Sequence, residues 1–139
     1  MSFLLDTNVI SEWVKPQPTA KVINWLEAVD EEQVFLSVVT IAEIRHGIEQ
    51  LPNGNRRQRL AAWLAGELIG RFEDRILGID LLIAEHWGIL MARAKRAGIV
   101  PSTMDGFVAA TAETYALTLV TRDTGNLGKL GIKVFNPWN

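Results

Sequence analysis

The feature that most constrains the fold is a regular alternation of short, β-rich apolar runs with longer segments of helical periodicity. The apolar runs span residues 3–5, 34–37, 75–78, 118–121 and 133–135. Such alternation is typical of a parallel sheet with helices on both faces. The runs are short and mostly apolar on both sides, as buried parallel strands are. The sequence therefore predicts an α/β fold, with a central parallel five-stranded sheet flanked by helices in an α/β/α sandwich.

Helical periodicity fills the segments between these strands. Apolar residues recur every three or four positions from Ile41 to Leu51, and every four from Leu60 to Phe72. Because Pro52-Asn53-Gly54 separates the two segments, we expect a helical hairpin inserted between the second and third strands. Further helices are expected over residues 21–29, 83–94 and 108–116.

Length and composition limit the class of protein. A chain of 139 residues that is 48% hydrophobic has room for one domain, residues 1–139, with a substantial core. It contains no Cys, which excludes disulfides and thiolate metal sites. The longest uncharged stretch, residues 33–42, is too short to cross a bilayer, and the N-terminus lacks the basic region of a secretory signal, so we expect a cytoplasmic protein with no membrane association. A net charge of −2 argues against binding nucleic acid by bulk electrostatics, so any such function requires a local site.

Carboxylates stand at the junctions between predicted strands and helices. They are Asp6 after the first strand, Glu43 in the first helical turn after the second, Asp105 at the start of the helix over residues 108–116, and Asp123 after the fourth strand. In an open α/β sheet these junctions converge at one edge, where sites form. Each acid taken alone also fits a helix cap or turn, and segments 40–43 and 102–105 match the capping-box pattern.

Taken together, the four acids indicate bound cations. Two unit charges about 5 Å apart repel by roughly 3 kcal/mol at an effective dielectric of about 20. The sequence offers no evident basic partner for all four, and oxygen ligands without Cys or paired His favour Mg²⁺ or Mn²⁺ over Zn²⁺. A carboxylate-held Mg²⁺ orients a phosphodiester and helps to generate hydroxide, so phosphodiester hydrolysis is the predicted chemistry.

Several polar residues lie close to these acids in the sequence. Thr7, Asn8 and Thr121 are predicted to hydrogen-bond the attacking water or the carboxylates, although each also fits a strand-end or capping position. Arg45 is a candidate for an RNA contact or for pairing with an acid. The basic run over residues 55–59 fits the solvated start of a helix better than it fits phosphate contacts near the hairpin turn.

The chain also resembles a known family over almost its whole length. The matching segments, in order, are residues 4–12, 37–43, 105–112, 121–125 and 135–138. On these segments it resembles the PIN-domain ribonucleases of the VapC type, and most closely the FitB-like toxins of bacterial type II toxin-antitoxin systems. In place of the Phe that relatives often carry a few residues after the fourth acid, this chain has Asn126-Leu127, which affects a second metal position and the packing of that loop.

This resemblance implies a fold, an activity and partners. The fold is a PIN domain, and the activity is that of an Mg²⁺-dependent endoribonuclease, with Mn²⁺ as a possible substitute. The implied catalytic residues and metal ligands are Asp6, Glu43, Asp105 and Asp123. The implied partners are an RNA substrate, a second copy in a homodimer, and a small DNA-binding antitoxin whose C-terminal segment blocks the site and commonly inserts a basic side chain among the carboxylates.

Two other classes of protein also carry acids at the end of the first strand. A haloacid-dehalogenase phosphatase needs a second Asp where this chain has Asn8, and a receiver domain needs paired acids where it has Asp6 alone. The main alternative is a catalytically weak binding subunit that sequesters an antitoxin or RNA.

Overall fold

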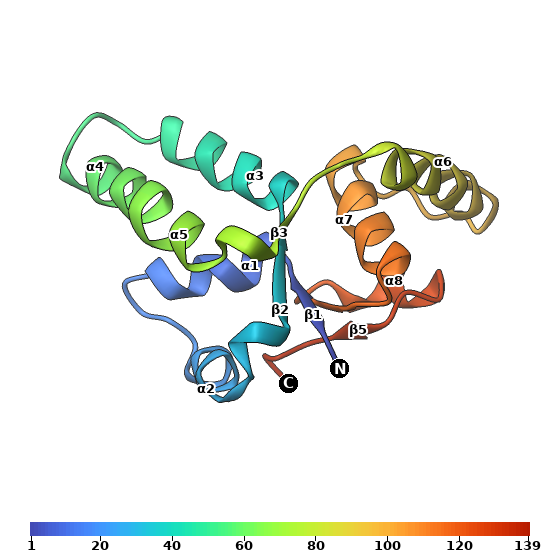
Figure 1. Ribbon diagram of the computed structural model, residues 1–139, viewed down its shortest axis with the longest axis horizontal. Coiled ribbons are helices and arrows are strands. Elements are labelled where there is room, and N and C mark those ends of the chain that lie inside the picture. The colour runs from blue at the N-terminus through green and yellow to red at the C-terminus, as the bar shows by residue number, and fades with distance from the viewer.

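In the computed structural model, which describes residues 1–139, a single sheet lies between two layers of helices (Figure 1). Its strands are β1 (Phe3–Leu5), β2 (Val34–Ser37), β3 (Ile76–Leu77), β4 (Thr118–Val120) and β5 (Val134–Phe135). They pair in the order β3-β2-β1-β4-β5, and every pair is parallel. The predicted α/β/α sandwich is confirmed, and each strand lies within one or two residues of its predicted position.

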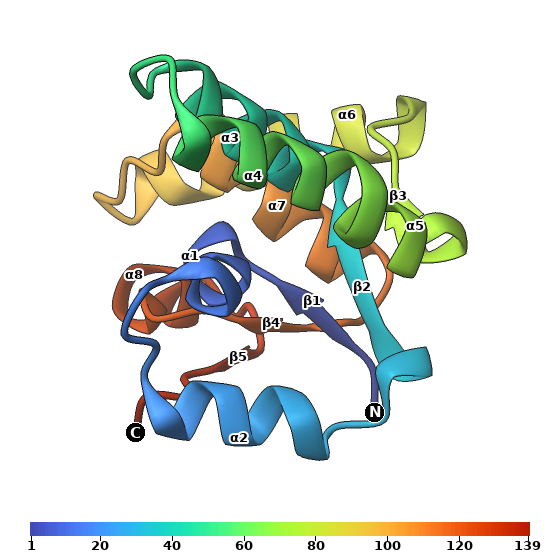
Figure 2. The ribbon, with the colours of Figure 1, turned by 90° about the vertical axis from the view of Figure 1, so that its left-hand side faces the viewer.

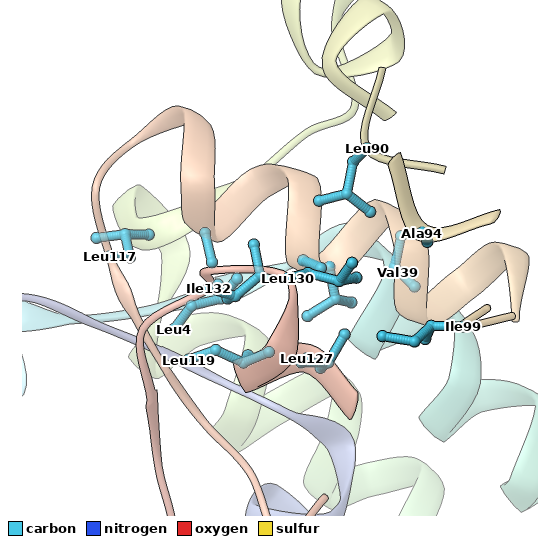
Figure 3. Packing of buried hydrophobic residues seen from close by; sticks show 13 residues of the cluster. Leu4, Val39, Leu90, Ala94, Ile99, Leu117, Leu119, Leu127, Leu130 and Ile132 are labelled. Carbon is cyan, nitrogen blue, oxygen red and sulfur yellow. The ribbon is translucent and has the colours of Figure 1, made fainter. Parts of the chain in front are cut away.

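The two faces of the sheet carry separate cores, because neighbouring side chains on a strand point to opposite faces. Leu4 and Leu119 lie in a cluster of 13 buried residues on one face (Figure 3). Leu5 and Val120 lie in a cluster of 12 buried residues on the other face. The apolar runs are therefore continuous because the central strands are covered on both sides.

Different parts of the chain supply the two helical layers (Figures 1 and 2). One layer contains α6 (Leu81–Arg96), α7 (Thr103–Thr114) and α8 (Thr124–Lys129). The other contains α1 (Thr7–Ile10), α2 (Ala20–Ala28), α3 (Val38–Glu49), α4 (Asn55–Ala62) and α5 (Ile69–Arg71), with a π-helical stretch, Trp63–Leu68, between α4 and α5. The predicted hairpin between β2 and β3 is present as α3 and the α4–α5 segment. None of the helices is both long and apolar enough to span a bilayer.

The start of α3 differs from the sequence-based expectation. The helix begins at Val38, and the Ser37 hydroxyl caps it by accepting a hydrogen bond from the Val39 amide at 3.0 Å. Glu43 therefore lies in the second helical turn, not the first, and the capping-box alternative for residues 40–43 is wrong. This leaves the Glu43 side chain free for a contact with another element.

Gly106 allows α6 and α7 to pack closely. A Cβ atom at this position would lie 2.7 Å from Met91 Sδ and 2.7 Å from Trp87 Nε1, closer than real contacts permit. The absence of a side chain here lets α7 approach α6, and it fixes where Asp105, the preceding residue, stands at the edge of the sheet.

Candidate active site

Asp6 joins the carboxyl ends of the two central strands. Its amide donates to the Val120 carbonyl of β4 at 2.9 Å, which extends the β1–β4 pairing by one residue. One carboxylate oxygen, Oδ1, caps α1 by accepting from the Thr7 amide at 2.8 Å. The other, Oδ2, accepts from the buried Thr121 hydroxyl at 2.7 Å. The capping alternative for Asp6 thus holds in part, but the cap uses only one of its two oxygens.

Two threonine hydroxyls connect the acids into one network. Thr7 Oγ1 donates to Glu43 Oε1 at 2.7 Å and so joins α1 to α3. Thr121 Oγ1, besides donating to Asp6, accepts from the Asp123 amide at 3.1 Å. Residues that are far apart in the sequence are therefore held around the end of β1 by Thr7 and Thr121.

Asp105 completes the cluster from α7. Its amide donates to the Ser102 hydroxyl, the N-cap of α7, at 3.1 Å, while its carboxylate makes no hydrogen bond or ion pair within the chain. Asp6, Asp105 and Asp123 line a common pocket of about 140 Å³. Ser102 and Asn126 also line this pocket, and the sequence analysis did not select either as a site residue.

The cluster carries negative charge that no cation of the chain neutralises. Burial raises the pKa of Asp6 above its ordinary value, and the nearby charges of Asp105 and Asp123 add to this, against the lowering effect of its hydrogen bonds. Burial likewise raises the pKa of Glu43, and the charges of Asp6 and Asp105 act in the same direction. The ion pairs of the molecule all involve other acids, namely Glu12, Glu31, Glu49 and Glu113.

The donor set has the chemistry of a hard-cation site. It offers carboxylate and hydroxyl oxygens without sulfur or imidazole, which suits Mg²⁺ or Mn²⁺. The carboxylates line the same edge of the sheet, but no three acidic or histidine side chains converge as a closed set of metal ligands. Hydrogen bonds to Thr7 and Thr121 hold the oxygens of Asp6 and Glu43, so closure around one ion requires the side chains to turn.

Two predicted contributors lie apart from this network. Asn8 makes no side-chain hydrogen bond, and its Oδ1 is buried without a partner. Arg45 is exposed and lies 4.0 Å from Glu49, so within the chain it pairs with an acid outside the cluster. The unusual Asn126-Leu127 pair lines the pocket, and Leu127 is also part of the core beneath it.

A parallel sheet with the order β3-β2-β1-β4-β5 and acids along its carboxyl edge is the arrangement expected of a PIN-domain protein. Comparison with known proteins supports this class. The PIN domain family matches residues 3–132, so the chain belongs to the PIN-domain family. Toxin FitB of Neisseria gonorrhoeae is 41% identical over 136 residues, which cover 98% of each chain. VapC ribonuclease Y4jK of Sinorhizobium fredii is 39% identical over 135 residues, covering 97% of this chain and 96% of the relative.

A solved structure supports the same relationship. The structure of FitAB bound to an IR36 DNA fragment contains a chain that matches with a TM-score of 0.94 and 39% identity, covering 99% of this chain and 96% of that one. The resemblance to FitB- and VapC-type toxins is therefore confirmed in both sequence and fold.

Proposed function

We propose that this chain is a divalent-metal-dependent endoribonuclease that acts as the toxin of a type II toxin-antitoxin pair. The observation that carries the proposal is the group of acids at the carboxyl edge of the sheet, for which the chain supplies no cation. The similarity to a protein named as a VapC ribonuclease supports the reaction class. Similarity to a protein named as a toxin supports the biological role.

The side chains of the cluster have distinct roles in this proposal. Asp6, Glu43, Asp105 and Asp123 hold Mg²⁺, or Mn²⁺ in its place. The bound ion supplies positive charge for the phosphodiester and lowers the pKa of water. Thr7 and Thr121 hold the Glu43 and Asp6 carboxylates at the edge of the sheet, from where both side chains turn toward the ion when it binds. Asp105 and Asp123, whose carboxylates have no partner within the chain, are free to turn toward a ligand.

The test compares Asp105→Asn with Asp74→Asn, because Asp74 is exposed, has no side-chain hydrogen bond and lies outside the pocket. We expect Asp105→Asn to lose RNA cleavage and toxicity, and Asp74→Asn to retain both. We expect wild-type cleavage to require Mg²⁺ and to stop in EDTA, and we expect Mg²⁺ to raise the thermal midpoint of the wild type more than that of Asp105→Asn. Equal cleavage by all three proteins, with and without EDTA, contradicts metal-dependent cleavage at this site. RNA or antitoxin binding without such cleavage identifies a binding subunit.

The proposal includes an antitoxin partner. The FitAB structure, in which a similar chain is part of a complex on DNA, supports an assembly with a DNA-binding protein. We expect the C-terminal segment of the antitoxin to lie across the pocket and to place a basic side chain among Asp6, Asp105 and Asp123. A synthetic peptide of that segment should inhibit cleavage, and its variant without the basic side chain should inhibit weakly.

A homodimer is also proposed, through a surface formed by α6, the loop that follows it and the first turn of α7. Leu82 and Ile89 are seven positions apart on one face of α6 and are 57% and 62% exposed. Val100, in the loop, and Met104, in the first turn of α7, are also exposed, at 89% and 40%. Contiguous exposed apolar patches mark interaction surfaces, and we propose that these side chains form one. We expect light scattering to give a dimer for the wild type and a monomer for Ile89→Glu, and a dimer for both contradicts this surface.

A further inference from the structure

A groove begins at the acid cluster and runs toward the helical hairpin. Its first part, of about 330 Å³, is lined by Thr7 and Glu43 and also by Arg56 and Trp63. A second hollow of about 410 Å³ shares Arg56 and Trp63 with the first and adds Arg59. Because the two share lining residues, they form one channel along the surface, which we call the basic groove.

Two arginines in the basic groove have no partner within the chain. Arg56 and Arg59 are exposed, and neither makes a side-chain hydrogen bond, an ion pair or a contact with an aromatic ring. Arg57, between them, is bound instead to Glu49 and Asn53. Positions three apart lie on one face of a helix, so Arg56 and Arg59 present their charges to the same side of α4.

The placement of Arg56 does not serve the stability of α4. The helix begins at Asn55, has no side-chain cap at Gly54, and carries no acid in its first turn. Arg56 lies in this first turn, where a cation opposes the helix dipole at a typical cost of about 0.3–1 kcal/mol. Arg59 lies in the last turn of α4, where this cost does not apply. A local rule broken without a compensating contact is expected at functional positions.

The charge of the molecule supplies the reason for a basic groove. The chain has a net charge of −2, and its site is a cluster of acids, so an approaching RNA backbone is repelled at the point where it must bind. Cations next to the cluster offset this repulsion. Arg56 and Arg59 lie in a groove that opens at Glu43, and Trp63, which lines both parts of the groove, offers a ring on which a base can stack.

We propose that the basic groove binds the single-stranded segment of RNA next to the scissile bond, with backbone phosphates on Arg56 and Arg59 and a base on Trp63. The inference rests on the proposed nuclease function, since it assigns a path to the substrate of that site. It makes Arg56 and Arg59 binding residues that lie away from the reacting atoms.

Binding is tested in an Asp105→Asn background, so that the RNA stays intact, with a fluorescein-labelled 20-nucleotide single-stranded RNA of mixed sequence. The test variant is Arg56→Gln/Arg59→Gln. The control is Lys95→Gln/Arg96→Gln, which removes the same charge from exposed residues at the end of α6 that make no side-chain contact. We expect the groove variant to lose about tenfold in affinity and the control less than about twofold. The slope of the logarithm of the binding constant against the logarithm of the salt concentration should become shallower by about 1.4 in the groove variant only. Each lost phosphate contact to a single strand reduces this slope by about 0.7.

A charge-retaining variant and the cleavage reaction complete the test. Arg56→Lys/Arg59→Lys should keep most of the binding. The thermal midpoint of each variant should stay within about 5 °C of that of its parent, because a charge near a helix end changes stability by no more than about 1 kcal/mol. In the otherwise wild-type protein, Arg56→Gln/Arg59→Gln should raise KM more than it lowers kcat, because the lost contacts bind substrate and transition state alike. Equal losses in the groove and control variants overturn the inference. Unchanged RNA binding in the groove variant also overturns it, and assigns the groove to a protein partner.

The two proposals can fail separately. If the wild type cleaves no RNA yet binds the labelled strand through Arg56 and Arg59, the proposed nuclease function is wrong and RNA binding in the basic groove is supported. If the wild type cleaves RNA and the groove variant does so with an unchanged KM, the nuclease function is supported and RNA binding in the basic groove is wrong.

Discussion

Helix α7 carries an acid near each end, and the two have opposite surroundings. Glu113, near its C-terminal end, lies 2.5 Å from His86 Nε2 and accepts from Arg93 Nη2 at 2.8 Å. Burial raises the pKa of Glu113, but the hydrogen bonds and charges of His86 and Arg93 outweigh it and hold this pKa below its ordinary value. Asp105, near the N-terminal end, has no such partner, and its charge raises the pKa values of Asp6 and Glu43.

Glu12 and Asp6 show the same contrast in the first segment of the chain. Glu12 is fully buried, yet it is paired with Lys15 and accepts from the Thr19 amide at 2.8 Å. These contacts fasten the loop before α2, and they outweigh burial to hold the pKa of Glu12 below its ordinary value. An acid that serves the fold is thus compensated inside the chain, whereas no cation of the chain pairs with the acids at the carboxyl edge.

The largest expected effect is on catalysis. Asp6→Asn should reduce RNA cleavage by at least about 100-fold, because it removes an anionic ligand where even an outer-shell change costs about 10–100-fold. Glu113→Gln should keep cleavage within about twofold of the wild type, since Glu113 pairs with His86 and Arg93, away from the pocket. Initial rates on one RNA under saturating Mg²⁺ measure both. A similar loss in both variants would remove the distinction between the two kinds of acid.

A smaller loss is expected from the hydroxyl that orients Asp6. Thr121→Val removes the donor to Asp6 and the acceptor for the Asp123 amide while keeping the side-chain volume. We expect about a tenfold loss of cleavage, typical of an outer-shell partner. Thr121→Ser, which keeps the hydroxyl, should restore most of the cleavage rate. It should also reach half of its maximal rate at a lower Mg²⁺ concentration than Thr121→Val does. Equal behaviour of the two variants would make Thr121 a packing residue only.

Removing the charge of Glu113 and removing that of Asp6 should change the stability of the protein in opposite directions. Glu113→Gln should destabilise the protein by about 1–2 kcal/mol, because it weakens hydrogen bonds to charged groups and leaves Arg93 partly buried without its counter-ion. Asp6→Asn should raise the free energy of unfolding in metal-free buffer by up to about 1 kcal/mol, because it relieves burial and repulsion of a charge. Urea unfolding at pH 7 measures both. Destabilisation by Asp6→Asn as large as by Glu113→Gln would give Asp6 a structural role.

Much of the fold follows from the sequence because the central strands are buried on both faces. Runs such as residues 3–5 and 118–120 stand out as apolar segments with polar residues at their ends, and the order of the acids at those ends gave the candidate site. The hairpin was readable because Pro52-Asn53-Gly54 breaks two clear helical periods. These signals are local, and local patterns are what a sequence displays directly.

The missed features depend on contacts across the chain. Helix α1 has four residues and is too short to show a period. The place of Glu43 was misjudged because two residues, Ser37 and Thr40, could cap α3, and only Ser37 does so. The bond from Thr7 to Glu43 spans 36 positions, and that from His86 to Glu113 spans 27, so no short motif shows which acids are paired.

The pH dependence of stability is the finest test of the two kinds of acid. A carboxyl with a raised pKa, such as Asp6, contributes stability that is full below its unfolded pKa of about 3.9 and is lost as pH rises through the raised value. A carboxyl with a lowered pKa, such as Glu113, contributes stability that is present above its unfolded pKa of about 4.3 and is lost as pH falls through the lowered value.

The two variants should therefore diverge from the wild type in opposite directions as pH rises. As pH rises above the unfolded Asp pKa of about 3.9, we expect Asp6→Asn to gain stability relative to the wild type. As pH rises toward the unfolded Glu pKa of about 4.3, we expect Glu113→Gln to lose stability relative to the wild type. Urea titrations in metal-free buffer at half-unit steps give both differences. The charges that face Asp6 are those of Asp105, Asp123 and Glu43. Removing one of them in Asp105→Asn should make the loss of stability with rising pH less steep than in the wild type. If the stability differences of Asp6→Asn and Glu113→Gln from the wild type changed with pH in the same direction, the chain would compensate both acids alike. The acids at the carboxyl edge would then need no external cation.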